Sequence, residues 1–217
     1  MNNTFPHLTI GIALIALMIL GGCSQGSDTS TPIKIGVIGA FTGNLANLAA
    51  DERIGLEIAR DEVNLAGGVN GRPLELIFED GKCDAKEALT AATKLAEVDG
   101  VFVILGGTCT GESMSTANVA NASGIVQLSA VTSGSVYSGT GDWTFRTNPV
   151  DNAKDLADLL LSSGYTRFAI VSEQTDFSQS IRKDFVRWIT EGGATIVADE
   201  QFQTADQDFR TQLVKIK

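Results

Sequence analysis

The chain has 217 residues, a length that suits one large domain or two small ones. Hydrophobic residues make up 43% of the chain and charged residues 19%, which favours a packed core over disorder. The net charge of −10 argues against a nucleic-acid partner, because such proteins attract phosphates with a basic face.

An uncharged apolar run at residues 8–22 indicates a secretory signal, since it is too short to span ~30 Å of hydrocarbon. Gly21 and Gly22 precede Cys23, which resembles the lipobox of bacterial lipoproteins, where the cleaved chain begins at a lipid-bearing cysteine. We therefore expect a signal peptide over 1–22, a lipid on Cys23 and a polar tether over 23–32. The protein would then be extracytoplasmic and anchored to a membrane. The alternative is a plain secretory signal with an incidental cysteine.

The positions of the histidine and the cysteines limit the kinds of functional site that the chain can contain. The single histidine, His7, lies in the predicted signal, so the mature chain has none. This excludes Ser-His-Asp and Cys-His nucleophilic sites and argues against zinc, so we expect no metal, no cofactor and no enzyme. Cys83 and Cys109 each follow a predicted strand at the same end of the sheet, which favours a disulfide. Its loop would contribute about 3–4 kcal/mol on the chain-entropy model. The alternative is two buried free thiols.

Strands and helices alternate along the chain. In chain order we predict a strand at 33–38, a helix at 44–65, a strand at 74–78, a helix at about 84–98, a strand at 101–105, a helix at 112–122, a strand at 125–128, an extended segment at 143–146, a helix at 152–161, a strand at 167–171, a helix at 178–190, a strand at 195–198 and a helix at 207–217. This alternation predicts an α/β fold with parallel sheets and right-handed crossovers.

Asn148-Pro149 marks an expected domain junction. Four core strands precede it and two follow, and a two-stranded parallel sheet could not cover its own apolar faces. We therefore expect lobe I over 33–148 and the start of an incomplete lobe II over 149–217, in a fragment of a longer protein. The alternative is one complete small domain to which the late elements add strands.

Three loops rich in Gly, Ser, Thr and Asn, at 39–47, 106–113 and 129–138, should meet at the carboxyl ends of the strands. Their backbone N–H groups and hydroxyls suit a carboxylate or a small polar ligand, although such loops are also ordinary turns. The glycines at 36–43 lack the spacing of a dinucleotide fingerprint, and the chain has no phosphate-loop motif, which disfavours nucleotide binding.

Three segments carry a family resemblance: IKIGVIGAFTGNLA at 33–46, EIARDEVNLAGGVNGRPLELIFEDGKCDAKEA at 57–88, and KLAEVDGVFVILGGTCTG at 94–111. They resemble the type I periplasmic solute-binding proteins, and most closely the leucine/isoleucine/valine-binding group. The resemblance implies two Rossmann-like lobes that close on a solute, and a disulfide between Cys83 and Cys109. It also implies the monomeric solute-binding component of an ABC importer, with permease subunits as partners and an amino acid, amide or organic acid as solute.

The resemblance also implies ligand-binding residues. It places a solute carboxylate against Thr110 and uses the loop Ser129, Ala130, Val131, Thr132 and Ser133. Either Thr132 or Ser133 would correspond to the family threonine. Leu48 and Phe177 stand where relatives carry tyrosines, which makes the site more apolar, although Phe177 could equally be a packing residue. The acidic residue that meets an amino group in the family would lie beyond Lys217.

Two other functions remain open at this stage. The same fold could serve as the ligand domain of a signalling receptor, which a transmembrane helix and a signalling module further along the chain would favour. An α/β enzyme is the third reading, and the missing histidines weigh against it.

Overall fold

The computed structural model describes residues 31–150 and 152–216. The predicted signal peptide, Cys23 and most of the tether lie outside the described residues. Within the described ranges, no helix is long and apolar enough to cross a membrane.

The first unit is a five-stranded parallel sheet in the order β2-β1-β3-β4-β5. Its elements are β1 (Ile33–Gly39), α2 (Ala46–Leu65), β2 (Leu74–Asp80), α3 (Ala85–Lys94), a π-helical turn at Leu95–Asp99, β3 (Val103–Gly106), α4 (Thr110–Ser123), β4 (Val126–Ser129), a 3-10 turn at Ser135–Tyr137 and β5 (Thr144–Arg146). The crossovers from β1 to β2 and from β2 to β3 run in opposite directions, so right-handed connections place α2 on one face and α3 on the other.

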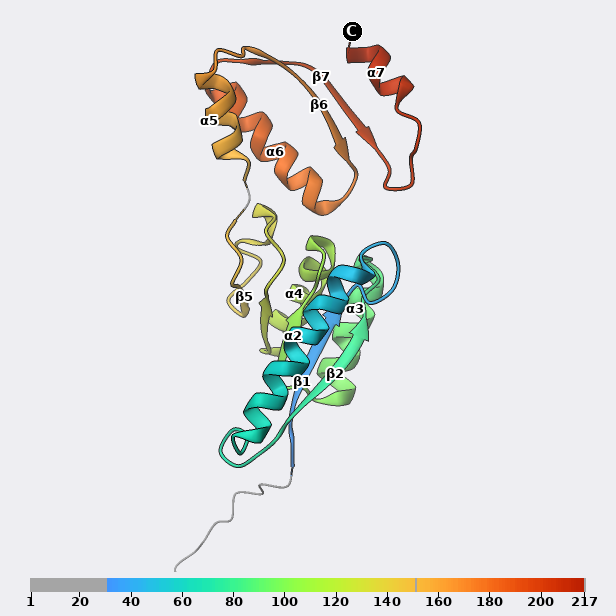
Figure 1. Cartoon of the computed structure of the whole chain (residues 1–217), viewed down its shortest axis with the longest axis vertical. Helices are drawn as coiled ribbons and strands as arrows, with labels where there is room; N and C mark the ends of the chain where they lie inside the picture. The colour runs from blue at the N-terminus through green and yellow to red at the C-terminus, as the bar shows by residue number, and fades with distance from the viewer. Residues whose placement is uncertain (1–30, 151, 217) are drawn as a thin grey trace, which may run out of the picture.

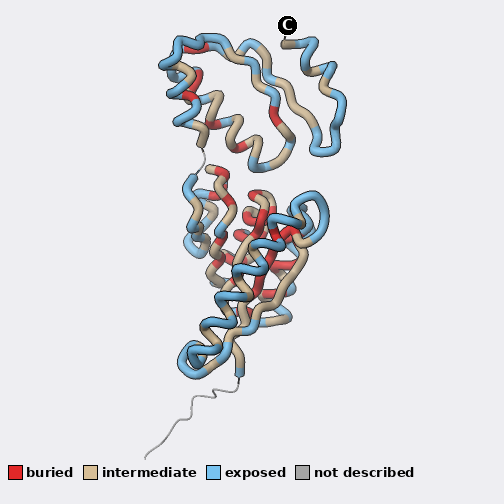
Figure 2. The backbone as a smooth tube through the Cα atoms, in the orientation of Figure 1, coloured by how far each residue is buried: buried red, intermediate tan, exposed pale blue. Residues whose placement is uncertain are grey.

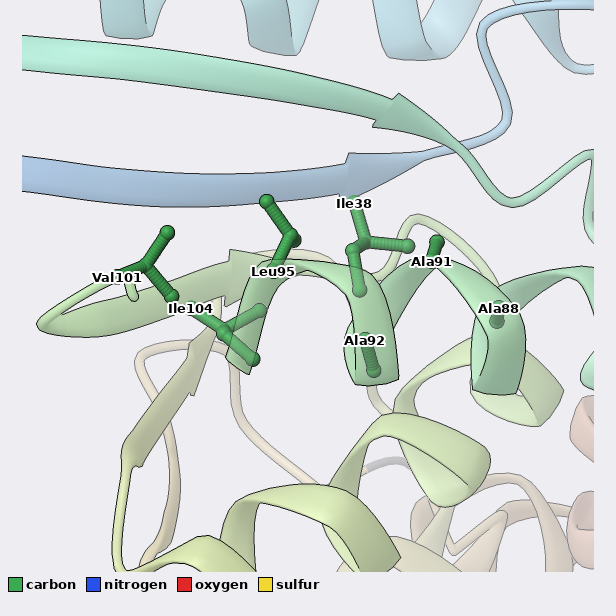
Figure 3. Packing of buried hydrophobic residues seen from close by; sticks show 7 residues of the cluster. All are labelled: Ile38, Ala88, Ala91, Ala92, Leu95, Val101 and Ile104. Atoms are coloured by element: carbon green, nitrogen blue, oxygen red, sulfur yellow. The ribbon is translucent and has the colours of Figure 1, made fainter. Parts of the chain in front are cut away.

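The core of this unit lies between β1, β3 and α3. Leu95 is fully buried with Ile38 and Ile104, and the alanines of α3 pack beside them (Figure 3). Gly36 leaves room for Leu95, because a Cβ at Gly36 would lie 2.8 Å from Leu95 Cδ1. Small residues on α3 and β1 thus let the helix sit close to the sheet.

The second unit contains α5 (Lys154–Ser162), β6 (Arg167–Glu173), α6 (Asp176–Glu191), β7 (Thr195–Phe202) and α7 (Arg210–Ile216). Strands β6 and β7 pair in parallel, and Ala157, Ile189 and Ala194 form a small core against them. The two units lie one beyond the other along the long axis of the molecule, joined by the segment around residue 150 (Figure 1). Buried residues are denser in the first unit than in the second (Figure 2).

The α/β class and the order of elements match the sequence predictions. Asp84 caps α3, accepting hydrogen bonds from the N–H groups of Lys86 and Glu87 at 2.8 and 3.0 Å. Most boundaries differ by one or two residues, and three differ by three or more. The helix predicted to 98 becomes a π-helical turn from Leu95, β7 continues to Phe202, and the last helix begins at Arg210 instead of 207. The structure separates the two sheets, while the exact boundary at 148–149 stays a prediction.

We expect Leu95→Ala to lower the free energy of unfolding by about 3 kcal/mol, because it removes a fully buried side chain and leaves a cavity beneath β1. Urea denaturation of the purified protein measures the change. Leu89→Ala is the control, since Leu89 on the adjoining helix α3 is 43% exposed. Equal losses in the two variants would contradict the assignment of Leu95 to the core.

Candidate functional site

A cavity of 740 Å³ lies between the carboxyl edge of the first sheet and the second unit. Thr42, Thr108 and Val131, one from each of the three predicted loops, line it together. The segment between β6 and α6 supplies the opposite wall, including Asp176 and Phe177. The convergence of the three loops was therefore predicted correctly, because parallel strands end at one edge of a sheet.

Most of the predicted ligand-binding residues line this cavity: Leu48, Thr110, Val131, Thr132, Ser133 and Phe177. Leu48 and Phe177 are 43% and 41% exposed, so neither is a packed core residue. Ser129 and Ala130 lie outside the lining. Ser129 is fully buried and Ala130 is exposed away from the cavity wall. The loop after β4 therefore turns only its second half toward the cavity.

The hydroxyls of this loop have different roles. Ser129 Oγ accepts a hydrogen bond from the Thr132 N–H at 3.1 Å, which shapes the turn. Thr132 Oγ1 lies 2.5 Å from Ser113 Oγ, so its hydroxyl is already bonded within the first unit. Ser133 and Thr110 line the cavity, and their hydroxyls have no hydrogen-bond partner among the described residues. These two side chains remain available to a ligand.

Two helices begin at the cavity, one from each unit. Helix α4 begins at Thr110 and α6 at Asp176, with Thr175 capping α6 by accepting from the Ser178 N–H at 3.2 Å. The units approach closely here, since a Cβ at Gly111 would lie 2.5 Å from Asp176 Oδ2. A helix N-terminus presents unpaired N–H groups and favours an anion.

The charged lining is mixed and was not predicted from the sequence. Lys82 contributes a cation from the first unit, and Glu173 and Asp176 contribute carboxylates from the second. The signal for Glu173 was present, because it lies at the carboxyl end of a predicted strand. Within 31–150 and 152–216, no group of three or more His, Cys, Asp or Glu side chains could hold a metal ion.

Cys83 and Cys109 form a disulfide with their Cα atoms 5.4 Å apart. Both cysteines line the cavity, so the bond joins two of its walls. The predicted disulfide is therefore present, and the alternative of two free thiols is wrong. Its loop of 26 residues corresponds to about 3.5 kcal/mol on the chain-entropy model.

A buried carboxylate accepts hydrogen bonds from both cysteines of the disulfide, and the sequence did not predict this role. Glu112 is fully buried, and its Oε1 and Oε2 accept hydrogen bonds from the N–H groups of Cys83 and Cys109 at 2.8 and 2.9 Å. Gly81 and Gly107 allow this approach, since a Cβ on either would lie 2.4 Å from an atom of Glu112. Burial raises the pKa of Glu112, and the two cysteine N–H groups act in the opposite direction.

A second carboxylate supports the neighbouring wall. Glu52 Oε2 accepts a hydrogen bond from Thr108 Oγ1 at 2.6 Å, and Thr108 Oγ1 accepts from the Ala40 N–H at 3.2 Å. The chain of bonds joins α2 to the loops after β1 and β3. Burial raises the pKa of Glu52, and the Thr108 hydroxyl offsets part of the rise.

A polar contact links the two units beside the cavity. Ser135 bonds to the Asp184 carboxylate and lies 2.9 Å from Ser180 Oγ, and the Val136 N–H donates to Ser180 Oγ at 3.3 Å. Ser180 and Asp184 lie on α6 and are both buried. This contact holds α6 against the loop after β4, which carries Ser133.

The described fold and cavity can be compared with known proteins. Residues 32–217 match the family model described as "Periplasmic binding protein". The leucine-, isoleucine-, valine-, threonine- and alanine-binding protein of Pseudomonas aeruginosa is 26% identical over 208 residues, covering 94% of this chain and 56% of its own length. A leucine binding protein from Thermotoga maritima superposes with a TM-score of 0.75 at 23% identity, over 84% of this chain and 52% of that one. The branched-chain amino acid substrate-binding protein of Streptococcus pneumoniae, solved with isoleucine, gives 0.73 at 26% identity, over 86% and 54%.

These similarities place the chain in a class of α/β proteins that share its fold. The chain belongs to the periplasmic binding protein family, because the family model matches nearly all of the described residues. It spans about half the length of the curated relatives that it matches, 56% for the Pseudomonas aeruginosa protein.

We expect Glu112→Gln to lower the free energy of unfolding by about 1–3 kcal/mol. Gln has one acceptor oxygen, so one cysteine N–H would face an amide NH₂ group and remain unpaired. Chemical denaturation under oxidising conditions measures the loss. The exposed Glu97→Gln is the matched control. A stability of Glu112→Gln equal to that of the control would show that the carboxylate does not hold the loops.

Glu52→Gln should become more stable relative to the parent protein as the pH rises from 4 to 7. Because burial raises the pKa of Glu52 above its ordinary 4.5, the folded state holds this proton more tightly than the unfolded state. The stability that this provides is present below pH 4.5 and is lost as the pH rises through the folded-state pKa. Gln keeps an acceptor for Thr108 without titrating.

Unfolding curves at both pH values measure the difference, and Glu97→Gln corrects for the loss of one negative charge. A Glu52→Gln difference that is constant with pH, or that falls as the pH rises, would contradict the direction of the shift.

Proposed function

We propose that this chain is part of the extracytoplasmic solute-binding component of an ABC importer, anchored to the membrane through Cys23. The observation that carries the proposal is the cavity between the units, where unbonded hydroxyls meet the N-terminus of α4. The named activities of the relatives support it, since the Pseudomonas aeruginosa protein is named for binding amino acids. The cavity offers groups for binding and no nucleophile with a base, so no covalent step is proposed.

The proposed solute is a small amino acid or a related organic acid. Its carboxylate would bind to the N-terminus of α4, with the hydroxyls of Thr110 and Ser133 donating to it. An ammonium group would face Glu173 and Asp176 on the opposite wall, where two carboxylates outnumber the single Lys82. Leu48 and Phe177 would contact an apolar side chain. A volume of 740 Å³ is ample for such a solute.

Closure would follow from binding, since a solute held by both units favours the arrangement in which both contact it. The contact between Ser135 and α6 gives a fixed point around which the second unit could move. The closed form would then be the one presented to the permease subunits.

Isothermal titration of the complete protein with L-leucine, L-isoleucine and benzoate tests the proposal. We expect at least one of them to bind, and Thr110→Val and Ser133→Ala each to weaken it by about tenfold, because a hydrogen bond to a charged group contributes roughly 1.5–3 kcal/mol. Ser123→Ala, at the exposed end of α4, is the control.

The proposal has two clear ways to fail. Turnover of any of these solutes would replace binding with catalysis. Binding that is unchanged in both Thr110→Val and Ser133→Ala would place the solute elsewhere. If leucine binds and benzoate does not, Asp176→Asn should weaken the binding of leucine, because the ammonium group of leucine would lose a carboxylate partner.

A further inference from the structure

The amino ends of the strands in the first unit carry a second concavity, at the opposite edge of the sheet from the solute cavity. It has a volume of 540 Å³ and is lined by residues that include Pro32, Lys34, Val69, Arg72, Asp99 and Phe102. Helices α2 and α3 run antiparallel to the strands, so their carboxyl ends lie at this same edge.

Large apolar side chains are exposed around this concavity. Phe102 is 79% exposed and Val69 is 42% exposed within its lining. Val98, next to Asp99, is 76% exposed, and Leu65, at the end of α2, is 89% exposed. We call Leu65, Val69, Val98 and Phe102 the amino-edge patch, because they lie at the amino edge of the first sheet. Val69 and Phe102 share the lining of one concavity, and Val98 and Leu65 lie at the same edge of the sheet. Exposed apolar groups gathered in this way mark a surface that contacts a partner or a membrane.

The charges in the concavity are mostly basic, although the chain as a whole carries −10. Lys34 and Arg72 line it beside Asp99, and the Asp99 carboxylate lies 3.0 Å from Lys94 Nζ. Lys34 Nζ also donates to the Asp99 carbonyl at 3.0 Å, and the exposed Glu97 stands next to Val98. The lining itself keeps a surplus of one positive charge, which suits the anionic headgroups of a bilayer.

The chain leads directly from this patch to the predicted anchor. Arg72 Nε donates to the Thr31 carbonyl at 2.8 Å, and Arg72 Nη2 to the Pro32 carbonyl at 3.2 Å, which fixes where the N-terminal segment leaves the fold. Cys23 lies eight residues before Thr31, so the lipid is at most ~28 Å of extended chain away. A tether of this length keeps the patch at high effective concentration near the bilayer.

We propose that the amino-edge patch docks on the lipid surface of the membrane that holds Cys23. This inference rests on the anchoring in the proposed function. The apolar side chains would enter the headgroup region, and Lys34 and Arg72 would lie among the phosphates. The solute cavity, at the opposite edge of the sheet, would stay clear of the lipid. Docking would add a second membrane signal to the lipid anchor.

The test separates docking from natural lipidation. In the complete protein, residues 1–23 are replaced by six histidines, which hold the chain on vesicles containing nickel-chelating lipid, three parts phosphatidylethanolamine and one part phosphatidylglycerol. Val98→Cys carries an environment-sensitive NBD fluorophore, and Leu159→Cys, on the second unit and 62% exposed, carries it in the matched control. Imidazole releases the protein and gives the unbound baseline.

We expect attachment to raise the emission at position 98 severalfold with a blue shift, and nitroxide-headgroup lipid to quench it, while position 159 is unchanged. Phe102→Asp should remove the effect at 98, and Leu156→Asp on α5 should not. No change at 98, an equal change at 159, or an emission at 98 that is already blue-shifted before attachment would each overturn the proposal. A mass spectrum of the exported protein tests the lipid on Cys23 independently, so a missing lipid contradicts the anchor and not the patch.

Discussion

The carboxylate of Glu112 joins the two loops on which one side of the cavity between the units depends. It lies at the start of α4 and reaches the N–H groups of Cys83 and Cys109, which follow different strands. The disulfide alone would limit the distance between those loops, but it leaves the direction of each backbone free. Two hydrogen bonds to a single rigid carboxylate restrict both directions, and a buried group that is fully bonded in this way is costly to disturb. Thr110 and Gly111 begin the helix from a backbone that is held on both sides.

Other side-chain hydrogen bonds join further segments around the cavity. Glu52 and Thr108 join α2 to the loop after β3, and Ser113 and Thr132 join α4 to the loop after β4. Each of these bonds lies within the first unit, which holds most of the buried side chains. The bonds between the units are fewer and centre on Ser135 and α6. The contact of Ser135 with α6 is therefore the main polar joint between the two units among the described residues, beside the cavity where we propose closure.

The two edges of the first sheet have separate chemistry because the strands are parallel. At the carboxyl edge the loops offer hydroxyls and helix N-termini, which suit a solute carboxylate. At the amino edge the helices end, and the exposed side chains there are apolar or basic. The proposed lipid-docking surface and the proposed solute site therefore lie at opposite edges of one sheet.

The sequence by itself determined the α/β class, the order of elements and the convergence of three loops. It also placed Cys83 and Cys109 at the same end of the sheet. These features follow from local periodicity and from the rule that parallel strands finish at one edge. A family resemblance predicted eight ligand-binding residues, of which Leu48, Thr110, Val131, Thr132, Ser133 and Phe177 line the cavity and Ser129 and Ala130 do not. Sequence patterns could not separate Ser129 and Thr132, whose hydroxyls bond inside the unit, from Ser133, whose hydroxyl has no partner within 31–150 and 152–216.

That distinction depends on how the loop after β4 packs against α4, elements whose residues are not neighbours in sequence. The role of Glu112 has the same origin, since its carboxylate bonds to Cys83 from another part of the chain, and Asp176 is brought close to Gly111 only by the fold. Only the tertiary structure decided them, because the direction of a side chain is fixed by its packed neighbours and not by its position in a motif.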